Sequence, residues 1–261
     1  MAAFQRSLRL KETLMTRTTG NPTKSVARSG VTRTGVVVGI LLVALLVLLI
    51  PPAIQQSREG ERRTQCRNRL KLLVLGLQNY HDLFQSFPPA YTIDPLGSRL
   101  QSWRLHVLPH VEQVPFSNSQ VWEPVTSERN SRFYRYDLMV FACPSDLDRV
   151  RCETDYMVAH GEQCVFQGIH SRSLKEIEDG ASNTLLISEV IETGVHWMQP
   201  IDLPFEDFTG FGHAGGFRSK HTGGIQAVMA DGSVRWFNVT TDPIVQRALL
   251  TANGGETISE F

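Results

Sequence analysis

Hydrophobic residues are concentrated in one long run near the N-terminus. Residues 35–53 read GVVVGILLVALLVLLIPPA, and no charged side chain occurs between Arg33 and Arg58. About 20 apolar residues in a helix span the hydrocarbon core of a bilayer, whereas a core helix of a soluble domain normally keeps a polar face. The run predicts a transmembrane helix over residues 35–54. It would separate a disordered cytoplasmic tail over residues 1–34 from a folded extracytoplasmic domain over residues 55–261.

The charges beside this run bear on its orientation. The preceding residues carry an excess of Lys and Arg, which favours a cytoplasmic N-terminus. The following flank is also basic, so the placement of every cysteine after the run contributes to the choice of N-in, C-out. A cleaved secretory signal is the competing interpretation. It requires a shorter apolar core and a small-residue cleavage site, whereas Pro51 and Pro52 follow here, so we expect a single-pass membrane protein with a retained anchor.

A second helical pattern follows the apolar run. Apolar residues recur at spacings of three and four from Leu70 to Phe84, which predicts an amphipathic helix over about residues 57–84. Pro51 and Pro52 are expected to bend or interrupt the backbone between the two helical stretches. The Phe-Pro-Pro sequence at 87–89 is expected to end the second one.

The middle of the chain gives weaker signals. Residues 103–111 (WRLHVLPHV) are apolar enough for a buried helix or strand, broken by Pro109. Residues 138–141 (LMVF) suggest a short strand that enters a turn at Cys143. Ser173 and Glu176 fit a capping box, which predicts a short helix ended by the Asp-Gly at 179–180.

The C-terminal part has the pattern of a sheet. Residues 184–191 (TLLISEVI) predict a strand, and residues 199–224 are rich in Gly and Pro and predict a long loop. The runs 225–229 and 234–239 flank an Asp-Gly pair, which indicates a β-hairpin. The predicted fold class is therefore α+β, with a long N-terminal helix packed on an antiparallel sheet.

Composition adds two constraints. Lys and Arg total 26, and Asp and Glu also total 26, so no net charge favours binding to nucleic acid, and we expect no nucleic-acid partner. The cysteines form no CxxC pair, which weakens a zinc-ribbon interpretation. Disulfides are plausible in an exported domain, but the sequence does not assign their pairing. The candidates are Cys66, Cys143, Cys152 and Cys164.

Several motifs carry a resemblance to a known family. They are PAIQQSRE at 52–59, RRTQCRNRLK at 62–71, LQNYH at 77–81, SFPP at 86–89, SWR at 102–104, CPSD at 143–146 and DGASNT at 179–184. In addition, nine residues separate His221 from Asp231-Gly232. In this order the motifs resemble a large bacterial family of pilin-like proteins, otherwise of unknown function, with a prepilin-type N-terminal signal and a C-terminal H-x(9)-DG motif. The resemblance implies a pilin-like fold.

The chain departs from that family at the signal. The family pattern is Gly-Phe-Thr-Leu-Ile-Glu, and the matching residues 30–35 read Gly-Val-Thr-Arg-Thr-Gly. Gly30 and Val31 mark the possible processing site, but Gly35 replaces the glutamate and Arg33 replaces an apolar residue. In the family, that glutamate is thought to neutralise the N-terminal amine of a neighbouring subunit. We therefore favour an uncleaved, membrane-anchored form.

Candidate chemistry in the C-terminal half is sparse. His221 and Asp231 suggest an acid–base pair or metal ligands, but a turn at Asp231-Gly232 with His221 bonded to the preceding loop is the simpler interpretation. The histidines show no local ligand spacing, so we predict no metal site and no cofactor. The segment with Asp179, Gly180, Ser182 and Asn183 suits a capped turn better than a calcium site. Signature motifs of enzymes are absent from the sequence, so we predict a non-enzymatic protein.

Three functional hypotheses follow. The first is a pseudopilin-type envelope protein, part of a secretion or filament-type assembly, whose partners are the lipid bilayer and other pilin-like subunits. The second is a membrane-tethered exported module that binds a solute or glycan through residues 199–224. The third is a metal-dependent enzyme that uses the C-terminal histidines.

Overall fold

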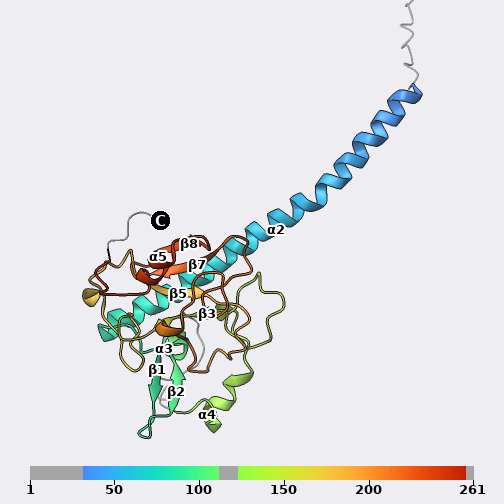
Figure 1. The fold of residues 1–261 in the computed structure, drawn as a ribbon. Helices are drawn as coiled ribbons and strands as arrows, with labels where there is room; N and C mark the ends of the chain where they lie inside the picture. The colour runs from blue at the N-terminus through green and yellow to red at the C-terminus, as the bar shows by residue number, and fades with distance from the viewer. Residues whose placement is uncertain (1–31, 112–122, 257–261) are drawn as a thin grey trace, which may run out of the picture. The chain divides into compact units, whose positions relative to one another are not determined.

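The computed structural model describes residues 32–111 and 123–256 (Figure 1). The chain divides into two compact units, Met1–Pro51 and Pro52–Phe261. The candidate processing site, Gly30 and Val31, and almost all of the predicted tail lie outside the described residues.

Helix α2 (Arg33–Phe84) contains both predicted helical stretches. Its apolar side chains from Val36 to Ile50 are all exposed, Leu48 by 73%. Within the described residues it is the one helix long and apolar enough to cross a membrane. The predicted interruption at Pro51 and Pro52 is wrong, because α2 is continuous through both. Proline has a helical φ, but inside a helix it removes one hydrogen bond and its ring crowds the carbonyl four residues earlier; α2 stays helical despite both.

The unit after Pro51 is built around a four-stranded sheet. Its strand order is β3 (Tyr156–Met157), β5 (Leu185–Glu189), β7 (Gly224–Met229) and β8 (Val234–Asn238), and all neighbours are antiparallel. The predicted hairpin is confirmed as β7–β8. Its turn contains Gly232 at φ 87°, a conformation that glycine adopts at no steric cost.

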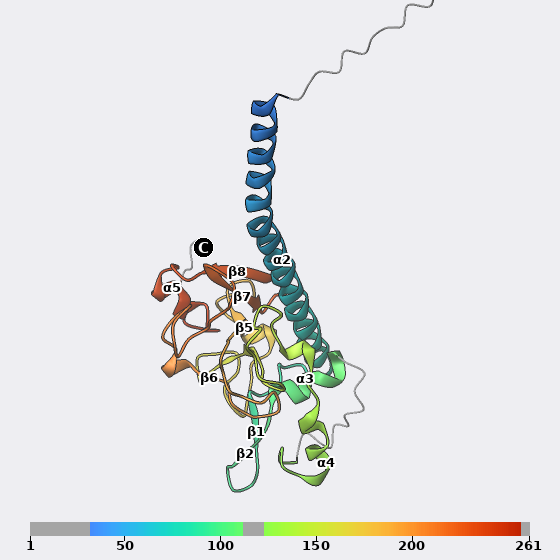
Figure 2. The ribbon, with the colours of Figure 1, turned by 90° about the vertical axis from the view of Figure 1, so that its right-hand side faces the viewer.

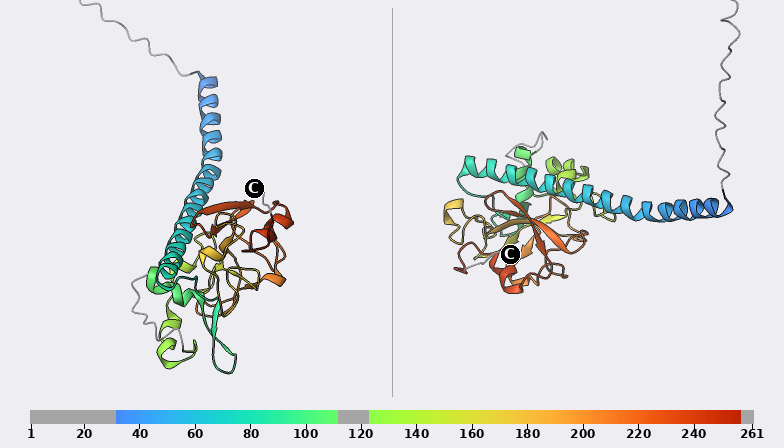
Figure 3. Two further views of the ribbon diagram at one scale, coloured as in Figure 1. Left: turned by 90° about the vertical axis from the view of Figure 1, so that its left-hand side faces the viewer. Right: turned by 90° about the horizontal axis from the view of Figure 1, so that it is seen from above.

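Both faces of this sheet are covered. The stripe Leu70, Leu73 and Leu77 of α2 is fully buried in a core cluster that includes Val228 of β7. A second cluster of phenylalanines and Leu249 packs with the alternate β7 residues. Figures 2 and 3 show the post-Pro51 part of α2 and the red C-terminal segment on opposite sides of the sheet. Because both faces are covered, every residue of β5 and β7 is buried.

Helix α3 (Trp103–Val111) lies very close to α2. A Cβ placed on Gly76 would lie 2.4 Å from Cγ2 of Val111 and 2.5 Å from Cγ1 of Val107, so only glycine permits this approach. The predicted break at Pro109 is wrong, since the helix continues to Val111. Burial of its apolar side chains compensates for the one backbone hydrogen bond that Pro109 removes.

Shorter elements complete the unit. The bounds of the further helices and strands are β1 (Tyr91–Ile93), β2 (Arg99–Ser102), α4 (Glu128–Ser131), β4 (Ala159–His160), β6 (Leu203–Pro204) and α5 (Pro243–Ala248). Strands β1 and β2 pair antiparallel, whereas β4 and β6 form a parallel pair. The predicted loop 199–224 therefore contains a strand, β6, and also a 3-10 turn at Phe205–Asp207.

Two further predictions concern short helical turns. The predicted strand at 138–141 is wrong: Met139–Phe141 is a 3-10 turn that buries Val140 and Phe141. Apolar runs this short fit a strand or a buried turn equally well. The capping box of Ser173 and Glu176 is confirmed, but it caps a 3-10 turn of three residues, Leu174–Glu176, which ends before Asp179.

A buried ion pair fixes the centre of the unit. The guanidinium of Arg104 lies 2.7 Å from Oδ1 of Asp202, and both side chains are at most 1% exposed. Arg104 also donates to the backbone oxygen of Tyr156 and to Oγ of Ser102, while the indole of Trp103 donates to Asp202. All these bonds compensate for the desolvation of two charges.

Candidate functional site

Glu189 is a carboxylate buried inside the sheet. It ends β5 and its exposure is 0%. Its Oε2 accepts the backbone N–H of Gln226 at 2.9 Å, while its Oε1 faces away from that strand toward a group of side chains from other elements. A carboxylate in this position is costly unless it is paired or coordinates a metal, so its neighbours identify a candidate site.

Two cysteines lie beside this oxygen. Cys66 comes from the buried stripe of α2, and its Sγ lies 2.7 Å from Oε1 of Glu189. Cys143 comes from the turn after Met139–Phe141, and its Sγ lies 2.8 Å from Sγ of Cys66 and 3.9 Å from the same Oε1. The hydroxyl of Tyr156 lies 2.9 Å from Sγ of Cys66. Three segments distant in the sequence therefore meet at two buried sulfurs.

His221 completes the group. Its Nε2 lies 3.4 Å from Oε1 of Glu189 and 3.8 Å from Sγ of Cys143. Its Nδ1 lies 2.6 Å from Oε1 of Glu59, which is about two helical turns before Cys66 on α2. Glu59 also forms an ion pair with Arg62 at 2.9 Å. The ring is thus held by Glu59 on one side and faces the sulfurs with the other nitrogen.

We call Cys66, Cys143, Glu189 and His221 the Cys–Glu–His cluster. One donor atom from each residue lies within 4.8 Å of every other, and all four residues are buried. Borderline-soft divalent cations accept such a donor set, which consists of two sulfurs, one imidazole nitrogen and one carboxylate oxygen. Two adjacent thiols can also be oxidised to a disulfide.

The electrostatics of the cluster separate the two thiols. The hydrogen bond from Cys66, together with that to His221, lowers the pKa of Cys143 to about 6 despite burial. Burial, reinforced by Cys143 and Glu189, raises the pKa of Cys66. Burial opposes protonation of His221, but hydrogen bonds with Cys143 and Glu189 outweigh it and raise the pKa of His221 to about 10. The cluster therefore favours a thiolate at Cys143 beside an imidazolium.

The other predicted cysteines lie elsewhere. Cys164 is buried in the second core cluster, and Cys152 lies at the edge of the first. All four cysteines are free thiols in the structure. Cys66 and Cys143 are therefore the pair that the fold brings together, and disulfide formation stays a prediction.

The two ends of the H-x(9)-DG motif have different surroundings. The ring of His221 bonds to Glu59 of α2, while its backbone N–H donates to Oγ of Ser219 in the preceding loop. Asp231 lies in the β7–β8 turn, where its Oδ1 accepts the backbone N–H of Ser233 at 2.8 Å. The motif thus places a histidine in the cluster and a turn at the far end of β7. The contacts described for His221 and Asp231 do not join them as an acid–base pair.

The DGASNT segment forms a turn of the kind expected. Gly180 has φ 94°, and the side chain of Asn183 donates to the backbone oxygen of Asp179. The Asp179 carboxylate accepts the backbone N–H groups of Gly254 and Gly255 at 2.7 and 2.9 Å. Ser182 is exposed beside Asn183. These oxygens hold the C-terminal segment against the turn.

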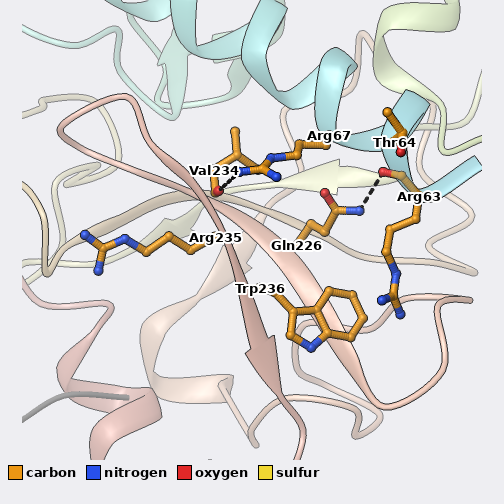
Figure 4. A pocket seen from close by; sticks show the side chains of 7 residues that line it. All are labelled: Arg63, Thr64, Arg67, Gln226, Val234, Arg235 and Trp236. Atoms are coloured by element: carbon orange, nitrogen blue, oxygen red, sulfur yellow. Dashed lines mark hydrogen bonds between the residues drawn. The ribbon is translucent and has the colours of Figure 1, made fainter. Parts of the chain in front are cut away.

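A cationic hollow adjoins the cluster (Figure 4). Its volume is about 440 Å³, and it is lined by Arg63, Thr64, Arg67, Gln226, Val234, Arg235 and Trp236. The guanidinium of Arg63 lies 3.9 Å from the Trp236 ring, and Arg67 donates to the backbone oxygen of Val234. The Trp236 ring also lies 6.4 Å from that of His221. The hollow combines positive charge with an aromatic face.

Sequence reasoning missed Glu59 and Glu189 and the meeting of Cys66 with Cys143. One signal was present: Glu189 interrupts the apolar run TLLISEVI. A near-continuous apolar run indicates a strand covered on both faces, and a charge buried in such a strand requires a partner. The cysteines and His221 gave no local ligand spacing, because the fold alone brings them together.

The chain matches the model of a known protein family. The model of the family described as "Protein of unknown function (DUF1559)" matches residues 55–164 and 206–244, more than half of the chain. The chain belongs to this family. Cys66, Cys143 and His221 lie within the matched ranges, and Glu189 lies between them. No curated protein and no solved structure matches the chain.

Proposed function

We propose that the protein is a membrane-anchored, pilin-like protein of the cell envelope with a structural or assembly role and no catalytic one. The observation that carries the proposal is the composition of α2 (Arg33–Phe84). Residues 35–51 are exposed and carry no polar or charged side chain, and the second half of the helix buries an apolar stripe under an antiparallel sheet. An anchor followed by a sheet-packed helix is the arrangement that the pilin-like resemblance implies.

The proposed orientation places the domain after Pro51 outside the cytoplasm. The basic residues before the apolar run favour a cytoplasmic N-terminus. The basic flank after the run suits the phosphate region of a lipid surface. We infer that the partners are the bilayer and other pilin-like subunits, and that Gly35, in place of glutamate, favours the uncleaved form.

Membrane attachment can be tested with one double variant and one single control variant of matched chemistry. Leu45→Arg with Leu46→Arg adds two charges to the apolar run, at about 2.5–3.5 kcal/mol each for insertion. The control is Leu96→Arg, because Leu96 is 92% exposed in the turn between β1 and β2. We expect the unchanged chain and the control to remain in the membrane pellet after alkaline extraction, and the double variant to be released. Release of the unchanged chain would refute the anchor.

The assembly role needs a separate measurement. Chemical cross-linking in intact membranes should give ladders of this chain or adducts with other envelope proteins, and a C-terminal alkaline phosphatase fusion should be active. The intact N-terminus, read by mass spectrometry, should begin at Met1 or Ala2. A mature end at Val31 would contradict the uncleaved form, and a strictly monomeric, unassociated chain would contradict the assembly role.

The second candidate is a membrane-tethered binding module. The cationic hollow with Arg63, Arg67 and Trp236 favours an anionic solute or an acidic glycan. Residues 201–203 of the predicted binding loop line a different, smaller cavity of about 250 Å³. A thermal-shift panel of anionic sugars and phosphates would support this function if one ligand stabilises the unchanged protein and Arg67→Gln abolishes the shift.

A further inference from the structure

We propose that the Cys–Glu–His cluster binds one zinc-type divalent cation, and that Cys66, Cys143, Glu189 and His221 are its ligands. The site would be structural and would connect α2 to the sheet. This inference goes beyond the envelope role, and it does not depend on membrane attachment.

The donor atoms have the separation that a shared ion needs. Zinc lies about 2.0–2.3 Å from nitrogen, oxygen or sulfur ligands, so ligands of one ion lie within about 4.6 Å of one another. The four donor atoms of the cluster all lie within 4.8 Å. The two sulfurs, 2.8 Å apart, would move apart to about 3.8 Å around a tetrahedral ion, a change within reach of side-chain rotations of two cysteines.

The surrounding contacts orient each ligand correctly. Nδ1 of His221 is bonded to Glu59, which leaves Nε2 for the ion, the usual carboxylate–histidine–metal arrangement. Oε2 of Glu189 accepts the N–H of Gln226, which leaves Oε1 for the ion. The hydroxyl of Tyr156 lies within hydrogen-bond distance of the Cys66 sulfur. The contacts of His221 with Glu59 and of Glu189 with Gln226 therefore occupy the atoms that the ion does not need.

The charge of the site also calls for a cation. The side chains of Glu189 and His221 are 0% exposed, and both sulfurs are buried. A buried carboxylate is costly unless it is paired or coordinates a metal, and thiols lose their protons when they bind a metal. A divalent ion therefore supplies positive charge where the buried donors are negative.

The donor chemistry selects the class of metal. Calcium and magnesium take oxygen ligands, whereas two sulfurs with one nitrogen and one oxygen in a four-ligand set suit zinc. Four protein ligands close the coordination shell, which is the pattern of a structural rather than a catalytic zinc site.

The test uses the full-length chain in detergent, purified with a reductant and without chelator. Elemental analysis by mass spectrometry should find one zinc per chain. After chelation, titration with Co²⁺ should give the sulfur-to-cobalt charge-transfer absorption and the intense visible bands of a tetrahedral site. Zinc should also raise the melting temperature of the stripped protein.

Variants locate the ion. Cys66→Ser, Cys143→Ser and His221→Gln should lose stoichiometric zinc and the charge-transfer absorption. Cys164→Ser is the matched control, because Cys164 is equally buried but lies in the other core cluster, and it should keep one zinc. Glu59→Gln should keep the cobalt spectrum but weaken zinc affinity about 10–100-fold, as expected for a group that positions a ligand.

Three results would overturn the proposal. One is the absence of zinc from the unchanged protein together with no cobalt spectrum. Another is a Cys66–Cys143 disulfide that forms in the exported protein and resists mild reduction, detected as a cross-linked peptide. The third is retention of zinc by His221→Gln and Cys143→Ser. The cobalt spectrum of the unchanged protein decides the question even where a variant fails to fold.

Discussion

Replacement of Gly76 by alanine should destabilise the domain after Pro51 by closing the gap between α2 and α3. The added Cβ would lie 2.4 Å from Cγ2 of Val111 and 2.5 Å from Cγ1 of Val107. Valine has one strongly preferred rotamer in a helix, so neither methyl group can move away freely. Overpacking of this kind costs about 1–3 kcal/mol, and with two stiff side chains in contact we expect the upper part of that range.

The same substitution also has a favourable part. Alanine is better than glycine in a helix by about 1 kcal/mol, so the net loss should be about 1–2 kcal/mol. Gly60→Ala is the matched control, because it makes the identical change in the same helix and its Cβ would meet nothing within 4 Å. Gly60→Ala should gain up to about 1 kcal/mol. The two variants should therefore differ by about 2–3 kcal/mol.

Denaturant unfolding of the full-length chain in detergent, followed by the fluorescence of its buried tryptophans, measures this difference. Trp103 begins α3 and is 0% exposed, so its emission should shift when α3 separates from α2. Thermal unfolding gives a second readout, at about 2–4 °C per kcal/mol for a domain of this size. Equal stability of the two variants would refute the close contact of α2 and α3.

Two further predictions concern buried charges. Asp202→Asn should lower the free energy of unfolding by about 3–5 kcal/mol, because it leaves the charge of Arg104 without its buried partner. Glu123→Gln, in an exposed ion pair, should lower it by less than about 1 kcal/mol. Thermal unfolding of both variants checks the contrast, and equal losses would contradict it. Burial lowers the pKa of His106 to about 4, so the fold favours its neutral ring and loses stability as pH falls from about 6.5 through 4. Between pH 6.5 and 4 the unchanged protein should lose about 3 kcal/mol more stability than His106→Gln. Denaturation at a series of pH values measures this difference, and an equal dependence of stability on pH in the two proteins would refute the role of His106.

Much of the fold could be predicted because the signals were local. The apolar run and the three-to-four spacing of Leu70, Leu73 and Leu77 identify α2, and the Asp-Gly pair identifies the β7–β8 hairpin. Each of these depends on residues that are neighbours in sequence. The short apolar stretches at 103–111 and 138–141 were ambiguous, because their conformation depends on what covers them and not on their own period.

The site could not be predicted in the same way. Its ligands come from a helix, a turn, a strand and a loop, and no two of them are closer than 32 residues in the sequence. Spacing rules for metal ligands describe ligands that are close in the sequence, so they do not predict this site. Only Glu189 gave a sequence signal, since a charge inside a strand buried on both faces requires a partner.

The position of Cys66 connects the cluster to the long helix α2. Cys66 and Glu59 are on α2, whereas Glu189 and His221 belong to the sheet and the loop before it. A bond shared by these residues closes loops of many tens of residues, and cross-links that close long loops gain the most in chain entropy. Zinc would therefore hold α2 on the sheet, whereas a Cys66–Cys143 disulfide would link α2 to the turn that contains Cys143. A disulfide uses two of the four residues, whereas a cation uses all four donors, which lie within 4.8 Å of one another. The grouping of the four donors is thus better explained by an ion than by a sulfur–sulfur bond.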